Sequence, residues 1–334
     1  MNDQAITTPS TRTADAVLVE LGYPSLVVVA GRVSIADLYP SKSKRCGIYV
    51  LEHADGMHYI GQAVDVVRRY GQHRKLYTDI VRFSFFACNR PSLDDHERRC
   101  IKEAEFRGLR LRNRMLVKQL LVESDLDDML DPAEQQNWLE SPSHFNSEAR
   151  LPLDPEQTCR QRYHSHFQRL GGDPAFEQVL ALLKTYVGTC IPVARRTELS
   201  FWSVSCLPTT NHAHHPRWAA VNIGEMEMFV LGWLPKHKEP WAFVNVSRQA
   251  LGPYALKRLK QYGVAYETDQ RGYRAAGGDD QTLSTGADTF TAMALALGDP
   301  DVARAARRLS LEVMRKRPNW YAKFHCFDLA DCLL

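Results

Sequence analysis

Residues 47 to 75, "GIYVLEHADGMHYIGQAVDVVRRYGQHRK", decide the expected fold of the first half of the chain. "GIYVLEH" alternates and is rich in β-formers, "ADG" is a turn sequence, and "MHYIGQA" is a second β-rich run, which together predict an antiparallel hairpin. Tyr49 and Tyr59 then occupy equivalent places on paired strands. Gly47 and Gly61, beside them, let a backbone or a ligand approach closely. The hairpin therefore brings two phenols together.

The segment after the hairpin predicts an amphipathic helix, with apolar residues at helical spacing and Asp65 near its start. Arg68 and Arg69 project one turn into this helix. His73 follows four residues after Arg69 and so lies on the same face. "IVRFSFFACN" then predicts a third strand, and "SLDDHERRCIKEAEFRGL" a second helix. Two strands, a helix, a strand and a helix therefore follow one another.

These residue types suit phosphodiester hydrolysis, which needs an activated water, an acidic group for a divalent metal and cations for the charge developing on phosphate. A phenol has a pKa of about 10, so a tyrosine base at neutral pH needs nearby cations, which Arg69 and His73 can supply. Glu97 is the candidate oxygen ligand for Mg²⁺ (or Mn²⁺). Glu103 and Glu105 compete for that role.

At these positions the sequence resembles the GIY-YIG endonuclease family. Gly47-Ile48-Tyr49 and Tyr59-Ile60-Gly61 look like its signature pair, and Arg69 and His73 stand where members carry an arginine and often a histidine. "ERRCIK" (97–102) is similar to the helix with the metal-binding glutamate, and Asn113 in "LRN" stands where members often have asparagine. The resemblance covers residues 45–118.

The resemblance implies a small three-stranded antiparallel sheet flanked by helices, within an α+β chain. It implies that one tyrosine orients or deprotonates the attacking water, that Glu97 holds one metal ion, and that Arg69 offsets charge on the phosphate. Asn113 is implied as a structural hydrogen-bonding residue. The sequence does not choose between Tyr49 and Tyr59 as the base, and it leaves open whether His73 assists.

The same half of the chain is basic, since residues 41–118 contain 17 Lys and Arg against 9 Asp and Glu. Such a segment suits a polyanion, and duplex DNA is the expected partner. A solvated helix face is the alternative. The residues expected to contact backbone phosphates are Arg68, Lys75, Arg98, Arg99, Lys102, Arg110 and Arg112.

The composition changes along the chain predict four parts: an N-terminal extension (1–40, disordered over 1–15), a nuclease domain (41–122), an acidic linker (123–149) and an α+β domain (150–334). The last part begins and ends with helical patterns, the final one broken at Gly298–Pro300, around a β-rich middle. Because a small catalytic module seldom chooses its target alone, this domain is expected to recognise DNA, a regulatory ligand or a protein partner. A homodimer that cuts both strands is compatible with the sequence.

Composition sets the remaining expectations. The 334 residues are 44% hydrophobic, yet no stretch approaches the roughly 20 apolar residues that span a bilayer. The polar start has no signal-peptide pattern, which favours the cytoplasm and no membrane partner. Eight scattered cysteines without a CxxC pair argue against a disulfide framework and a zinc ribbon.

The favoured function is a Mg²⁺-dependent endonuclease in restriction or defence against foreign DNA. A repair or recombination nuclease acting on branched DNA is the nearest alternative. A nuclease effector restrained by a sensing C-terminal domain and a binding protein without catalysis are two others.

Overall fold

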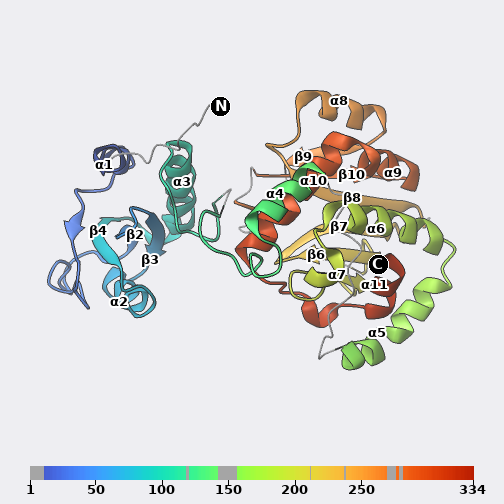
Figure 1. Cartoon of the computed structure of the whole chain (residues 1–334), viewed down its shortest axis with the longest axis horizontal. Coiled ribbons are helices and arrows are strands. Elements are labelled where there is room, and N and C mark those ends of the chain that lie inside the picture. The colour runs from blue at the N-terminus through green and yellow to red at the C-terminus, as the bar shows by residue number, and fades with distance from the viewer. Residues whose placement is uncertain are drawn as a thin grey trace. The chain divides into compact units, whose positions relative to one another are not determined.

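The structure is a computed structural model that describes residues 11–117, 120–141, 156–210, 212–236, 238–268, 276–277 and 281–334. The chain divides into two compact units, Met1–Val122 and Glu123–Leu334. Figure 1 shows a sheet flanked by helices in each of them. Both sheets are antiparallel, so the α+β class expected from the sequence is confirmed.

The first unit contains a four-stranded sheet in the order β1-β4-β2-β3. The elements along the chain are α1 (Thr11–Glu20), β1 (Val27–Val28), β2 (Gly47–His53), β3 (His58–Ala63), α2 (Val66–Leu76), β4 (Ile80–Ala87), the 3₁₀ turn η1 (Arg90–Ser92) and α3 (Leu93–Phe106). The hairpin, the two helices and the third strand expected between residues 47 and 107 are all present. Asp65 caps α2, because its carboxylate accepts a hydrogen bond from the Arg68 amide at 3.0 Å.

Strand β2 is buried along its whole length because helices cover both faces of the sheet. Ile48 and Val50 pack with α1 and α3 residues in one core. Tyr49 and Leu51 point to the opposite face, into a second core with α2. This period of two directs the Tyr49 ring toward α2.

The N-terminal segment belongs to the first unit, which corrects the expected separate extension over 1–40. Leu18 of α1 is fully buried in the α3-side core, and β1 adds a fourth strand by pairing with β4. Asp15 holds Arg82 of β4 at 3.0 Å. The apolar face of α1 and this ion pair fix the segment in place. The disorder expected over 1–15 is wrong for residues 11–15, which are helical in α1, and residues 1–10 lie outside the described residues.

The second unit contains a six-stranded sheet in the order β5-β6-β7-β8-β10-β9. Its strands are β5 (Trp202–Cys206), β6 (Arg217–Ile223), β7 (Met226–Trp233), β8 (Pro240–Ser247), β9 (Ala265–Thr268) and β10 (Thr282–Ala287). The β-rich segments expected in the middle of this half correspond to β5, β6, β7 and β8.

The helices of the second unit lie before, between and after these strands. They are α4 (Pro132–Glu140), α5 (Glu156–Gly171), α6 (Phe176–Cys190), α7 (Ala194–Thr197), α8 (Pro253–Gln261), α9 (Phe290–Gly298), α10 (Pro300–Lys316), the 3₁₀ turn η4 (Ala322–Phe324) and α11 (Phe327–Leu333). The break expected at residues 298–300 is confirmed, because Asp299 caps α10 and Pro300 starts it. All eight cysteines are free thiols.

The acidic segment folds as part of the second unit as far as Ser141, which differs from the expected linker. Asp131 and Glu134 form a capping box at the start of α4. Arg315 of α10 donates to Asp127 at 2.6 Å and to Gln135 at 2.7 Å. The acidic residues therefore have a partner within the unit. Residues 142–155, which contain the rest of the expected linker, lie outside the described residues.

No helix within the described ranges combines the length and the apolar character needed to cross a bilayer.

Candidate active site

The two glycines of the hairpin make room for an aromatic ring and for a close strand. In the β2–β3 register Tyr49 pairs with Gly61, whereas Tyr59 pairs with Leu51. The phenols are therefore diagonal neighbours on one face and not directly opposite. A β-carbon on residue 61 would lie 2.5 Å from the Tyr49 hydroxyl oxygen, and one on residue 47 would lie 2.0 Å from the Phe86 carbonyl oxygen. Only glycine fits at either position.

Tyr49, Arg69 and His73 form one hydrogen-bonded group beneath the sheet. The Tyr49 hydroxyl lies 2.6 Å from His73 Nε2, and Arg69 Nε donates to the same hydroxyl at 3.2 Å. Because the arginine can only donate, the phenol proton is free to be donated to His73. Arg69 and His73 come from successive turns of α2, as their spacing predicts.

Burial controls the titration of this group. Burial, with a smaller contribution from the Arg69 charge, lowers the pKa of His73 to about 4. His73 is therefore neutral at neutral pH, which corrects the expectation that it adds positive charge. Burial also raises the pKa of Tyr49, although the Arg69 guanidinium acts in the opposite direction. Desolvation thus outweighs the cation, and Tyr49 stays protonated.

Tyr59 is the phenol of the pair that reaches the surface. Its ring lies 6.2 Å from the Tyr49 ring and 4.8 Å from the His73 ring. Tyr49 is only 1% exposed, whereas Tyr59 is half-buried. Burial raises the pKa of Tyr59, and a hydrogen bond from Arg69 and its charge lower that pKa. Arg69 therefore contacts both phenols, but only Tyr59 is accessible to a substrate.

Glu97 lies on α3, which covers the other face of the sheet. The Gln62 amide nitrogen, on β3, donates to Glu97 at 2.9 Å and to Asp94 at 2.6 Å. The Glu97 charge raises the pKa of both Tyr49 and Tyr59. The Glu97 carboxylate on α3 therefore acts electrostatically on phenols that lie on the opposite face of the sheet. Strand β3, at the edge of that sheet, lies between them.

The donor set around Glu97 fits a hard divalent cation. Mg²⁺ accepts one or two protein carboxylates and keeps several waters, and Asp94 and Glu97 supply two carboxylates one helical turn apart. No group of three or more His, Cys, Asp or Glu side chains among the described residues could hold a metal ion. The described residues thus offer these two carboxylates, joined by the Gln62 amide, and do not form a closed metal centre.

Asn113 holds the strand that carries Tyr59. Its carbonyl oxygen accepts from the Ile60 amide at 3.0 Å, and its amide nitrogen donates to the Ile60 carbonyl at 2.6 Å. The side chain is 4% exposed. Asn113 thus extends the edge of β3 as a further strand would, and it does not contact the Tyr49 group.

The residues expected to bind phosphate fall into three groups. Arg112 is engaged within the protein, since it holds Asp55 and Asp79 at 2.7 Å each and also contacts His53. Its charge is compensated, which removes the reason to assign it to DNA. Arg98 is half-buried on α3. The exposed residues are Arg68, Lys75, Arg99, Lys102 and Arg110.

Gln62 and Asp94 are site residues that the sequence reasoning missed. Gln62 follows Gly61 directly and, by strand alternation, points to the face opposite Tyr59. Asp94 stands three residues before Glu97, which places it one turn away on the same helix. Both signals are visible in the sequence but neither is specific, because a single amide and a helix-start aspartate are common.

Comparisons with known proteins return no match: no family model, no curated protein and no solved structure is similar to this chain.

Proposed function

We propose that the first unit is a Mg²⁺- or Mn²⁺-dependent DNA endonuclease of the GIY-YIG type. The observation that carries the proposal is the contact of Arg69 with both phenols of the hairpin, within reach of the Glu97 charge. A guanidinium, a half-exposed phenol and a carboxylate pair around one edge strand are the groups that phosphodiester hydrolysis needs. The hairpin with its two glycines and the α3 position of Glu97 also agree with the resemblance of the sequence.

In this proposal Tyr59 orients the attacking water, because Tyr49 is too buried to contact a substrate. Tyr49 donates a hydrogen bond to neutral His73 and accepts one from Arg69, which holds the guanidinium in place. Arg69 stabilises the charge that develops on the phosphate oxygens. Glu97 with Asp94 would hold a divalent ion, which would supply positive charge for the leaving oxygen.

The setting proposed is restriction or defence against foreign DNA in the cytoplasm. The exposed cations of α2 and α3 (Arg68, Lys75, Arg99 and Lys102) support a backbone-phosphate path that does not read sequence. Cleavage and binding should therefore weaken as salt is raised.

The test compares the wild type with Tyr59→Phe, Arg69→Ala and Glu97→Ala on duplex DNA, with and without Mg²⁺. Each substitution should lower single-turnover cleavage by at least about 100-fold, the effect of losing a positioned catalytic group. DNA binding, measured by fluorescence anisotropy, should largely persist.

Two matched controls accompany these variants. Tyr70→Phe removes a phenol of α2 that bonds to the Arg32 carbonyl at 3.1 Å, outside the site. Glu105→Ala removes a carboxylate that lies about three helical turns after Asp94 on α3. Both should cleave at the wild-type rate. Undiminished cleavage by Glu97→Ala would reject the metal assignment, and undiminished cleavage by Arg69→Ala would reject the catalytic site.

A further inference from the structure

The second unit contains a pocket of about 320 Å³ on one face of its sheet, which we call the β6 pocket. Its floor is formed by Ser205, Ala220, Asn222 and Glu227, from strands β5, β6 and β7. Ser205 pairs with Ala220 and Asn222 pairs with Glu227 in the sheet register, so the four residues lie close together on adjacent strands. The volume falls in the range of small-molecule sites.

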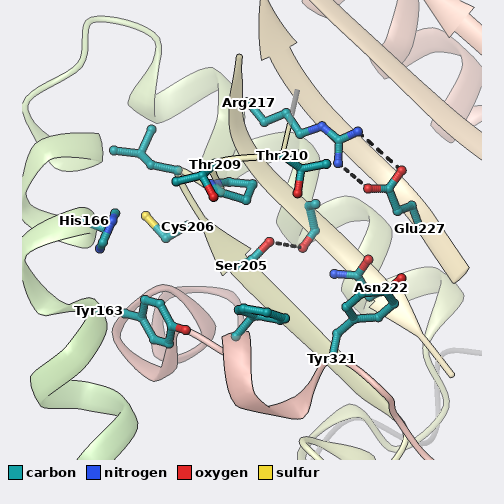
Figure 2. A pocket seen from close by; sticks show the side chains of 14 residues that line it. Tyr163, His166, Ser205, Cys206, Thr209, Thr210, Arg217, Asn222, Glu227 and Tyr321 are labelled. Atoms are coloured by element: carbon teal, nitrogen blue, oxygen red, sulfur yellow. Dashed lines mark hydrogen bonds and ion pairs between the residues drawn. The ribbon is translucent and has the colours of Figure 1, made fainter. Parts of the chain in front are cut away.

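The walls of the β6 pocket come from segments far apart in the sequence. Tyr163 and His166 are supplied by α5, Thr209 and Thr210 by the segment after β5, and Tyr321 and Phe324 by the η4 region. Figure 2 shows the labelled side chains surrounding the pocket. The pocket therefore forms only when these segments have packed together.

The ionised groups that line the β6 pocket cancel one another. Arg217 and Glu227 form an ion pair across β6 and β7, with side chains 9% and 21% exposed. Burial and the Arg169 charge lower the pKa of His166, which therefore stays neutral. Burial raises the pKa of Tyr321, which keeps its phenol uncharged. A neutral ligand is favoured, because the one ion pair among the described lining residues is already internally compensated.

The remaining lining groups select a flat ligand with a polar edge. The Tyr321 and Phe324 rings lie 6.4 Å apart, and Tyr163 lies beside this wall, because its hydroxyl donates to the Lys323 carbonyl at 2.9 Å. Aromatic faces stack on planar rings, and an amide side chain reads a base edge through one donor and one acceptor. Asn222 is 5% exposed and supplies that amide, and Ser205 and Thr210 add hydroxyls.

We propose that the β6 pocket binds an uncharged planar heterocycle with hydrogen-bonding groups along one edge, of the class of a nucleobase or nucleoside. The site lies within the second unit and uses none of the residues of the candidate nuclease. The proposal therefore stands or falls separately from the proposed function, and its readout is binding, not cleavage.

The test titrates the full-length protein with free nucleobases, the corresponding nucleosides and their 5′-monophosphates, by isothermal calorimetry and ligand-observed NMR. At least one base or nucleoside should bind saturably. Comparing the titrations with bases and with nucleosides identifies which of these two ligand classes the pocket recognises. The monophosphate should bind no more tightly, because Arg217, the cation among the described lining residues, is already paired with Glu227.

Two substitutions locate the binding. Asn222→Leu keeps the volume of the side chain but removes the amide, and should weaken binding at least about tenfold. Thr210→Val, at an exposed residue of the wall, should weaken binding at least about threefold and serves if Asn222→Leu does not fold. The matched control Thr185→Val, on exposed α6 surface, should bind as the wild type does.

Three outcomes would overturn the proposal: no saturable binding of any base or nucleoside, binding of monophosphates alone, or binding that neither pocket variant weakens.

Discussion

Gly61 has no room for a side chain, because the Tyr49 hydroxyl occupies the space next to its α-carbon. A β-carbon there would lie 2.5 Å from that hydroxyl and 2.7 Å from the ring carbon that carries it. The phenol is buried and bonded to His73 and Arg69, so it has no free direction in which to move. The motif glycine is thus explained by packing against the motif tyrosine of the neighbouring strand.

We therefore expect Gly61→Ala to destabilise the first unit by about 1–3 kcal/mol, the usual cost of overpacking a core. Gly71→Ala is the matched control, since no atom lies within 4 Å of its β-carbon position and it sits inside helix α2. That control should stabilise the unit by about 0.5–1 kcal/mol. Urea unfolding followed by tyrosine near-UV circular dichroism measures both, and equal effects of the same sign would contradict the packing argument.

The buried histidines His58 and His73 predict a pH dependence of stability. Burial lowers the pKa of each to about 4, whereas an unfolded chain has a histidine pKa of about 6.5. The unfolded state therefore takes up protons first as the pH falls. Stability is fully present above about pH 6.5 and is lost between there and about pH 4, by on the order of 1–3 kcal/mol per histidine.

Hydrogen exchange of peptides that cover residues 47–76 measures this loss, after correction for the intrinsic exchange rate. Protection should fall between pH 6.5 and pH 4.5, and His73→Gln should make the decline shallower. Protection that is constant over this range would show that the histidines are not buried as neutral groups.

At the scale of elements, periodicity and turn chemistry account for most of the first unit. The "ADG" turn joins β2 to β3, and helical spacing with an Asp65 cap gives α2, because both signals are local. The two-residue strand β1 gives no such signal. Val27 and Val28 are exposed, and they become a strand only because the edge of β4 is there to pair with them. The packing of α4 was also not predictable from sequence, because its contact with Arg315 of α10 joins residues 180 positions apart.

The ion pairs of Arg315 give the element-scale prediction. Arg315 donates to Asp127 and Gln135, and its side chain is 18% exposed. Arg315→Ala leaves the Asp127 carboxylate without this partner, at a cost of about 1–3 kcal/mol. We expect limited proteolysis to cut residues 123–140 faster in this variant. Arg308→Ala, which removes an exposed i,i+4 pair of α10 with Glu312, is the control and should leave the cutting rate unchanged. Rapid cutting of the wild-type segment would favour a free linker instead.

At the scale of the whole molecule, the chain is two units with separate cores. The division falls between Val122 and Glu123. All six tryptophans, the first of them Trp138, lie in the second unit, so tryptophan fluorescence reports on that unit alone.

We expect fragments 1–122 and 123–334 to fold separately, since each has its own sheet and its own buried core. The hydrogen-exchange protection of each fragment should match that of the same residues in the full chain. The tryptophan emission of 123–334 should equal that of the full chain. Loss of protection in either fragment would mean that the unit needs the rest of the chain to fold.

The sequence alone determined the hairpin, the helix and strand order of residues 47–107 and the α+β class. It also determined that Arg69 and His73 lie on one face of the same helix. Those features depend on spacing between near neighbours, which fixes direction along a helix or strand. Only the tertiary structure decided that His73 is neutral, that Tyr59 and not Tyr49 reaches the surface, that Arg112 is engaged by Asp55 and Asp79, and that Gln62 joins Asp94 to Glu97. Burial and long-range contacts set these properties, because desolvation and charge compensation depend on which distant segments pack around a group.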